Sequence, residues 1–187
     1  MIPHTRLAMQ GKFLVSEPAL LDYFFERSII LLAEHNKDGS FGVIINKPVN
    51  IKLNEVISDI PPNDFKVFLG GPVSPDNLFF VHMLGDIIED SIPITENLYW
   101  GGNFDQIKEL VAEHRISQDK IHFYLGYSGW TANQLDQELE SKSWVVVNSS
   151  TDAVFSQKPF DLWREYLMKL GDKYAIWANQ PMDPFLN

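Results

Sequence analysis

The feature that most constrains this fold is a series of short segments rich in β-branched and aromatic residues. Segments of this kind are typical of strands, and they cover Ser28 to His35, Phe41 to Asn46, Phe65 to Leu69, Leu78 to Leu84, Ile121 to Tyr127, Trp144 to Asn148 and Tyr174 to Ala178. The first two flank a turn that contains Asp38 and Gly39, a pair that readily takes positive φ, so we expect an antiparallel hairpin. Their unbroken apolar runs predict burial on both faces.

Helix signals are fewer than strand signals. Two helix starts carry a capping pair spaced by three residues, Asn103 with Gln106 and Thr131 with Gln134. A C-terminal helix is predicted by apolar side chains at helical spacing, namely Phe160, Trp163, Leu167 and Leu170, and Gly171 would end it. A short helix is expected over Leu53 to Ile57. Because strands outnumber helices and one pair is hairpin-linked, we predict an α+β fold and not a regular doubly wound sheet.

Length and composition indicate one compact domain over residues 1–187. A chain of 187 residues with 45% hydrophobic content can build a single core, and no linker-like tract divides it. The absence of cysteine excludes disulfides, thiolate catalysis, cysteine-type zinc sites and iron–sulfur clusters, and it favours a cytoplasmic location. Residues 1–12 lack the pattern of a signal peptide, and the apolar runs are too short to span a membrane.

The charge of the chain opposes nucleic-acid binding. The formal net charge is −10, and no Lys or Arg occurs between Lys66 and Lys108. Binding to phosphates depends on clustered basic residues that displace counterions, so nucleic acid is not an expected partner. The acidic residues of the middle third are interpreted as a solvated face.

The segment from Gly126 to Trp130 is the main candidate for catalysis. We expect it to lie between a strand and a capped helix, the setting in which an exposed nucleophile such as Ser128 is held. The motif is incomplete, because its fifth position requires glycine and is Trp130 here. No general base is assigned, and His82 is only a weak candidate. The alternative is that the glycines shape a tight turn while Trp130 fills the core.

Other special residues give no complete signature. The pairs Gly70-Gly71 and Gly101-Gly102 follow apolar segments, but no nucleotide-binding fingerprint is present, so tight turns explain them and no cofactor is predicted. The histidines show no metal-ligand spacing, so no metal is predicted either. Arg27 precedes the most apolar strand segment, where an arginine must reach solvent or a partner. Both a structural ion pair and a ligand-binding role stay open for it.

Three ordered blocks of the sequence carry a resemblance to a known family. The first block comprises Gly11 to Val15, Pro18, Leu20, Asp22, Phe25, Arg27 to Ile30, His35 and Gly42 to Pro48. The others comprise Gly70 to Val73 with Phe80 to His82, and Gly126 to Trp130 with Gln134, Leu135 and Glu138. In these blocks, and over nearly its whole length, the chain resembles the YqgE/AlgH family of bacterial proteins.

The resemblance implies a compact α+β domain whose branched, partly barrel-like and mostly antiparallel mixed sheet is surrounded by helices. The resemblance implies no particular biochemical activity, because the family has none that is agreed. One branch of the family carries the label of a transcriptional regulator, which the charge argument opposes for this chain. The chain also departs from the common family pattern at Tyr23, which follows Asp22 in place of proline, and at Thr131 to Asn133, where relatives have Pro-Gly.

Taken together, the sequence favours a non-enzymatic cytoplasmic protein that binds a partner protein or a small ligand. The surface expected to bind it comprises Arg27, Asn46, Lys47, Gly70, Gly71, Pro72 and Trp130. Two alternatives stay open: a hydrolase that uses Ser128, with His82 as a weak candidate base, and a transcriptional regulator by family label. The sequence specifies no ligand, pathway or oligomeric state.

Overall fold

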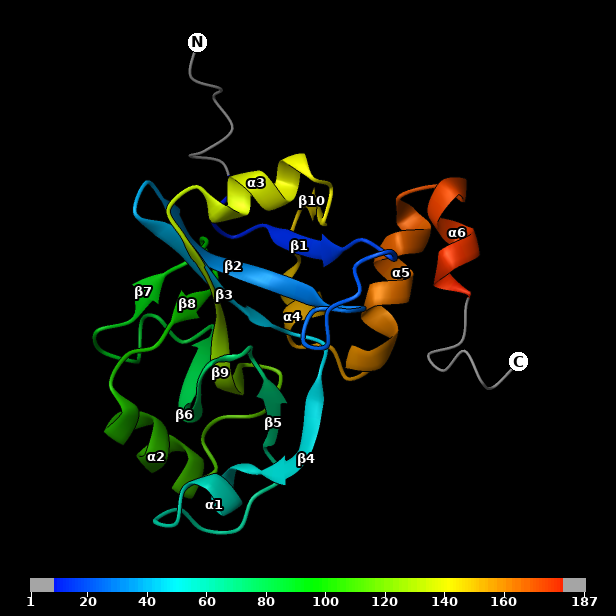
Figure 1. The fold of residues 1–187 in the computed structure, drawn as a ribbon. Coiled ribbons are helices and arrows are strands. Elements are labelled where there is room, and N and C mark those ends of the chain that lie inside the picture. Colours follow the sequence, from blue (N-terminus) through cyan, green and yellow to red (C-terminus); the bar gives the residue numbers. More distant parts are fainter. Residues whose placement is uncertain (1–8, 180–187) are drawn as a thin grey trace.

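The computed structural model describes residues 9–179, which form a strand-rich domain with helices on its outside (Figure 1). The strands are β1 (Phe13–Ser16), β2 (Ile29–Asn36), β3 (Gly39–Ile44), β4 (Pro48–Lys52), β5 (Lys66–Leu69), β6 (Val73–His82), β7 (Ile92–Pro93), β8 (Tyr99–Trp100), β9 (Ile121–Thr131) and β10 (Trp144–Val147). The helices are α1 (Leu53–Val56), α2 (Phe104–Ala112), α3 (Gln134–Glu140), α4 (Thr151–Val154), the 3₁₀ turn η2 (Pro159–Asp161), α5 (Leu162–Lys169) and α6 (Asp172–Ala178).

The strands form one branched sheet with the order β10-β1-β2-β3-β9-β6-β8-β7. The branch lies at β9, whose C-terminal part pairs with β3 and whose N-terminal part pairs in parallel with β5, which in turn pairs with β4. All other pairings are antiparallel within the described residues. The α+β class and the branched, mostly antiparallel sheet are therefore confirmed, and the sheet stays open between β10 and β7 and does not close into a barrel.

The predicted hairpin is present as β2 and β3. Glu34 pairs with Phe41 and Asn36 pairs with Gly39, so the turn between the strands is short. The apolar residues Ile29 to Ala33 are all buried, as expected for a strand covered on both faces. One face of β2 packs under α3 and the other packs toward α4 and α5.

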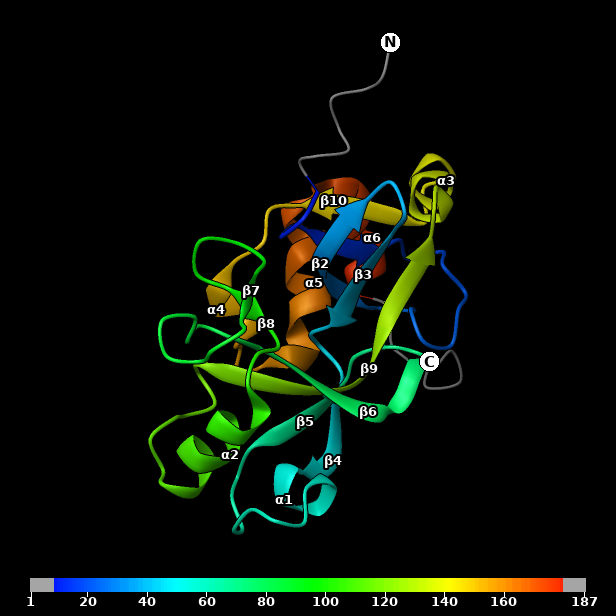
Figure 2. The same cartoon turned by 90° about the vertical axis from the view of Figure 1, so that its left-hand side faces the viewer.

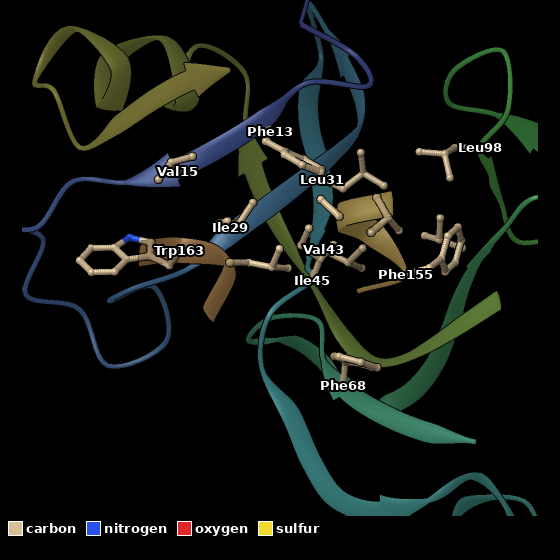
Figure 3. Close-up of a cluster of buried hydrophobic side chains, with 14 of the residues drawn as sticks. Phe13, Val15, Ile29, Leu31, Val43, Ile45, Phe68, Leu98, Phe155 and Trp163 are labelled. Atoms are coloured by element: carbon tan, nitrogen blue, oxygen red, sulfur yellow. The ribbon is translucent and has the colours of Figure 1, made fainter. Parts of the chain in front are cut away.

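The largest core cluster lies between the sheet and the C-terminal helices (Figure 3). It joins side chains of β1, β2 and β3 with Phe155 and Trp163, which follow much later in the chain. Two smaller clusters lie beneath α1 and α2 and beneath α3. Within residues 9–179, no helix combines the length and the apolarity needed to cross a bilayer.

The prediction of a strand over Tyr174 to Ala178 is wrong. These residues belong to α6, which follows Gly171 at φ +106 and packs against α5. A short apolar and aromatic run fits a strand and a helix equally well from its pattern alone. Here Ala178 is buried and Trp177 is exposed, the one-sided burial of an amphipathic helix.

The predicted turn at Gly126 to Trp130 is also wrong, because β9 continues without interruption to Thr131. The turn follows later, at residues 132–133, and α3 begins after it. Only half of the predicted capping pair is present: the Gln134 side chain accepts the Thr131 backbone N–H at 3.0 Å, but the residue that precedes the helix is Asn133 and not Thr131. Glycine inside a strand was mistaken for glycine in a turn.

Other differences concern short or polar strands. The sequence pattern missed β1, which is buried at every position and so shows no alternation, and it missed β4, β7 and β8, which are short or exposed. β6 begins five residues earlier than predicted, with a register shift between Val73 and Leu78.

Phe160 was predicted on the buried stripe of the C-terminal helix, yet it lies in η2 with 71% of its surface exposed. Of the N-terminal stretch interpreted as lacking a signal peptide, residues 1–8 lie outside the described part.

Candidate functional site

A hollow of about 640 Å³ brings together three of the residues that the sequence singled out, Arg27, Asn46 and Lys47. It lies between the loop before β2, the junction of β3 with β4, and the C-terminal helices. We call it the basic pocket, and its lining comprises Glu26, Arg27, Asn46, Lys47, Phe160, Asp161, Trp163, Arg164, Ala178 and Asn179.

Asn46 is buried beside the basic pocket, where its side chain bridges two backbone groups. Its side-chain oxygen accepts the backbone N–H of Ile29 at 2.8 Å, and its amide nitrogen donates to the backbone carbonyl of Arg27 at 2.9 Å. Arg27 has φ +51, a left-handed backbone conformation that is strained for any residue that carries a long side chain. The Asn46 amide therefore helps to hold the backbone that presents the Arg27 side chain.

The Arg27 guanidinium lies over the ring of Trp163, with its central carbon 5.3 Å from the ring centroid. This is within the range of a cation–π interaction. The indole N–H of Trp163 donates to the carbonyl of Ser16 at 3.0 Å and to its hydroxyl at 3.1 Å, and the ring is buried. That hydroxyl also accepts the backbone N–H of Ser28 at 2.9 Å. The ring under Arg27 is thus fixed to β1 through Ser16, and Trp163 is among the core side chains drawn in Figure 3.

Lys47 and Arg164 supply the other positive charges. The Lys47 ammonium donates to the carbonyl of Phe24 at 2.7 Å. Partial burial lowers the pKa of Lys47, while the carboxylates of Glu26 and Asp22 partly oppose this shift. Arg164 donates to the Asn179 side chain at 2.6 Å. Among the described residues, the lining thus holds three basic and two acidic residues, in a chain whose net charge is −10.

Ser128 and His82, the weak catalytic candidates, are not brought together. Ser128 is fully buried within β9, and its hydroxyl donates to the carbonyl of Gly70 at 3.0 Å. His82 pairs with Ile121 at the opposite end of β9. Its Nε2 lies 2.8 Å from the carbonyl oxygen of Gly101, and burial lowers its pKa. The Ser128 hydroxyl is therefore not exposed, and His82, at the other end of β9, is not within reach of it.

Gly70 and Gly71 lie where two strands cross at close range. A Cβ on Gly70 would lie 2.2 Å from the carbonyl oxygen of Gly126, and one on Gly71 would lie 2.4 Å from the carbonyl of Tyr127. These contacts leave no room for a side chain, which explains both glycines without a ligand. Pro72 follows them and is half-buried. None of the three lines the basic pocket.

Trp130 is buried and fixed by a carboxylate. Its indole N–H donates to Oε2 of Glu138 at 2.8 Å, and the indole of Trp144 donates to the same oxygen at 2.7 Å. Gln134 donates to the other oxygen, Oε1, at 3.0 Å. Trp130 therefore joins β9, α3 and β10, and it lies apart from the basic pocket.

The sequence did not associate the C-terminal helices with this site. The sequence predicts Trp163 only as an apolar residue of a C-terminal helix, and it does not single out Arg164. Local patterns do not show that α5 packs against β1, a contact that joins residues 147 positions apart. Among residues 9–179, no cluster of three or more His, Asp or Glu residues is placed to hold a metal ion.

Comparison with known proteins identifies close relatives. A family model described as AlgH-like matches residues 13–175. A UPF0301 protein of Cytophaga hutchinsonii is 41% identical over 179 residues, which cover 95% of this chain and 98% of the relative. Another from Parabacteroides distasonis is 39% identical over 183 residues, covering 97% of this chain and 92% of the relative.

Solved structures show the same fold. The solution structure of the AlgH protein from Pseudomonas aeruginosa matches with a TM-score of 0.74 and 26% identity, covering 94% of this chain and 95% of that one. A crystal structure of a protein from Corynebacterium diphtheriae also matches with a TM-score of 0.74, at 22% identity and 92% coverage of both chains.

Proposed function

This chain belongs to the AlgH-like family of bacterial proteins, and from that premise we propose that it is a non-enzymatic, cytoplasmic protein that binds a small anionic ligand in the basic pocket. The observation that carries the proposal is the convergence of Arg27, Lys47 and Arg164 on one hollow of a strongly acidic chain. The lack of cysteine supports the cytoplasmic location.

The size of the basic pocket favours a small ligand over a flat protein contact. Its volume of about 640 Å³ falls in the range of roughly 300–1,000 Å³ that is typical of small-molecule sites. The buried ring of Trp163 supplies an apolar wall, and Phe160 forms an exposed apolar rim. A ligand with an apolar body and one anionic group would therefore match both parts of the lining.

The anionic group is inferred from the type of basic residue. Arg27 and Arg164 carry planar guanidinium groups, which bind carboxylate or phosphate through two parallel hydrogen bonds. Lys47 adds a single charge at the side of the pocket. A ligand bound here would contact the loop before β2 together with α5 and α6.

The other two functions considered from the sequence have less support. The burial of Ser128 and its bond to Gly70 disfavour a hydrolase. The net charge of −10 disfavours direct DNA regulation.

The proposal is tested by calorimetric titration with multivalent anions at low ionic strength. Inorganic phosphate, pyrophosphate and citrate are the probes, and saturable binding of at least one of them is expected. Arg164→Gln and Arg27→Gln should each weaken that binding about tenfold or more, the usual effect of losing a charge-assisted hydrogen bond. Lys169→Gln is the matched control, because Lys169 lies on the same helix but outside the pocket. Absence of saturable binding, or unchanged binding in both arginine variants, would overturn the proposal.

A further inference from the structure

A second hollow, of about 780 Å³, lies against the sheet and shares none of its described lining residues with the basic pocket. Its floor is formed by four aromatic side chains, one each from β3, β6, β8 and β9, namely Phe41, Phe79, Trp100 and Tyr127. These strands are neighbours in the sheet order, and Figure 2 views the molecule from the side on which they lie. We call this site the aromatic hollow.

Each of the four rings contacts two of the others. Phe41 lies 5.1 Å from Trp100 and 6.1 Å from Tyr127, measured between ring centroids, and Phe79 lies 5.5 Å and 5.4 Å from the same two rings. Three of the four pairs are edge-on and one is stacked. All four side chains pack on the main core but are only partly buried. The core thus reaches the surface here as a group of partly buried aromatic rings.

The strand register explains why the surface over these rings is hollow. Phe41 pairs directly with Gly129 on β9, which has no side chain to cover the rings. A Cβ at Gly129 would lie 3.1 Å from the edge of the Tyr127 ring. Gly129 therefore leaves open the space that a larger residue on this strand would fill.

The rim of the aromatic hollow is acidic. Glu34 and Asp38 line it, and none of the described residues that line it is Lys or Arg. Asn36 connects these two, because its amide donates to the Glu34 carboxylate and its oxygen accepts the Asp38 backbone N–H at 2.8 Å. The hairpin of β2 and β3 therefore places both carboxylates beside the aromatic rings.

We propose that the aromatic hollow binds an organic cation that carries an alkylated ammonium group. Aromatic faces carry negative electrostatic potential, and several faces around one cation stabilise it most when it is poorly hydrated. An alkylated ammonium is less strongly hydrated than the ammonium of lysine, and it needs few hydrogen-bond acceptors. The carboxylates of Glu34 and Asp38 add charge complementarity and repel anions. The site is independent of the anion binding proposed above.

The test compares a cation with a neutral molecule of the same shape. Choline and its carbon analogue 3,3-dimethylbutan-1-ol are titrated into the full-length protein, and the indole N–H signal of Trp100 is followed by NMR. We expect a saturable shift with choline and binding of the neutral alcohol that is about fivefold to tenfold weaker, the usual size of a cation–π contribution. Equal binding of the two molecules, or no saturable shift with choline, would overturn the proposal.

Variants separate the contributions of the rings and the carboxylates. The double variant Glu34→Gln, Asp38→Asn should weaken choline binding several-fold and leave binding of the alcohol unchanged, because only the charge is removed. Trp100→Leu should abolish choline binding, followed through the other aromatic signals. Trp177→Leu is the control, since Trp177 is exposed on α6 and does not line the hollow. If the double variant folds normally and binds choline as tightly as the parent protein, the proposal is wrong.

Discussion

The basic pocket and the aromatic hollow differ in charge and in how they are built. The aromatic hollow takes its floor from neighbouring strands of one sheet, and no basic residue belongs to its described lining. The basic pocket is assembled from a loop, a strand junction and two helices near the end of the chain. One therefore depends on strand register, and the other depends on contacts between distant segments.

This difference shows which interactions each site needs. In the sheet, alternation of side chains and one glycine are enough to align four rings and leave space above them. In the basic pocket, the strained backbone of Arg27 is held by a buried side-chain amide. We expect the loop-built site to be the more sensitive to loss of a single polar contact.

The largest expected effect follows from removing that contact. Asn46→Ala should lower the free energy of unfolding by about 3 kcal/mol, because it leaves the N–H of Ile29 and the carbonyl of Arg27 without their partner. Urea denaturation measures the loss. The control Asn36→Ala, at the exposed hairpin, should cost less than about 1 kcal/mol. If Asn46→Ala also costs less than about 1 kcal/mol, the Asn46 side chain does not hold this backbone.

Acid should weaken both sites together, because both depend on the same core. Burial next to Phe68 and Phe155 lowers the pKa of His122 to about 4, with a smaller contribution from Lys66 in the same direction. The unfolded chain takes up this proton near its ordinary pKa of about 6.5. The contribution of His122 to stability is therefore complete above that value and is lost as the pH falls toward 4, by about 2–3 kcal/mol in total.

Denaturation midpoints measured between pH 7 and pH 4 test this expectation. His122→Phe should flatten the acid side of the curve. An unchanged slope in that variant would assign the loss to other groups, and His82, whose pKa burial also lowers, would be the next to examine.

Arg27→Asn should separate binding from stability at the basic pocket. Asparagine tolerates the left-handed conformation better than arginine, and this offsets the lost cation–π contact with Trp163. We expect stability to change by less than about 1 kcal/mol, while anion affinity falls about tenfold. Calorimetry and denaturation of the same preparation give both values. A parallel loss of stability would show that Arg27 is mainly structural.

Gly129→Ala should affect the aromatic hollow alone. The new Cβ would lie 3.1 Å from the Tyr127 ring, so the ring must shift and the hollow must shrink. Choline affinity should fall about threefold with a stability loss of about 1 kcal/mol. Anion binding at the basic pocket, titrated in parallel, should not change. If it does, the two sites are coupled through β9.

The smallest expected effect is a pH dependence that only the basic pocket shows. Because burial lowers the pKa of Lys47, its charge is lost at a lower pH than that of an exposed lysine. Anion affinity should therefore fall about twofold as the pH is raised from neutral into the alkaline range, and Lys47→Met should remove this slope. Choline binding followed over the same range should stay constant, and an equal slope at both sites would contradict the assignment to Lys47.

Part of the candidate site was predictable from the sequence. Arg27 is singled out by the sequence because it stands before an apolar strand segment, while Asn46 ends the next predicted segment and Lys47 follows it. All three line the same pocket. Gly70, Gly71 and Pro72 were grouped with them, but they serve close strand crossing, which leaves the same glycine signature as a binding loop. The sequence also grouped Trp130 with them, but it lines the aromatic hollow instead of the basic pocket, and its indole N–H donates to Glu138.

The sequence by itself determined the α+β class, the first hairpin and most of the central strands, because hydrophobic periodicity and turn residues act over a few neighbouring positions. The tertiary structure alone decided that Tyr174 to Ala178 is helical, that β9 runs through Ser128, and that Trp163 lies beneath Arg27. Each of these outcomes depends on packing between segments far apart in the chain. Such contacts override weak local preferences, and no local pattern records them.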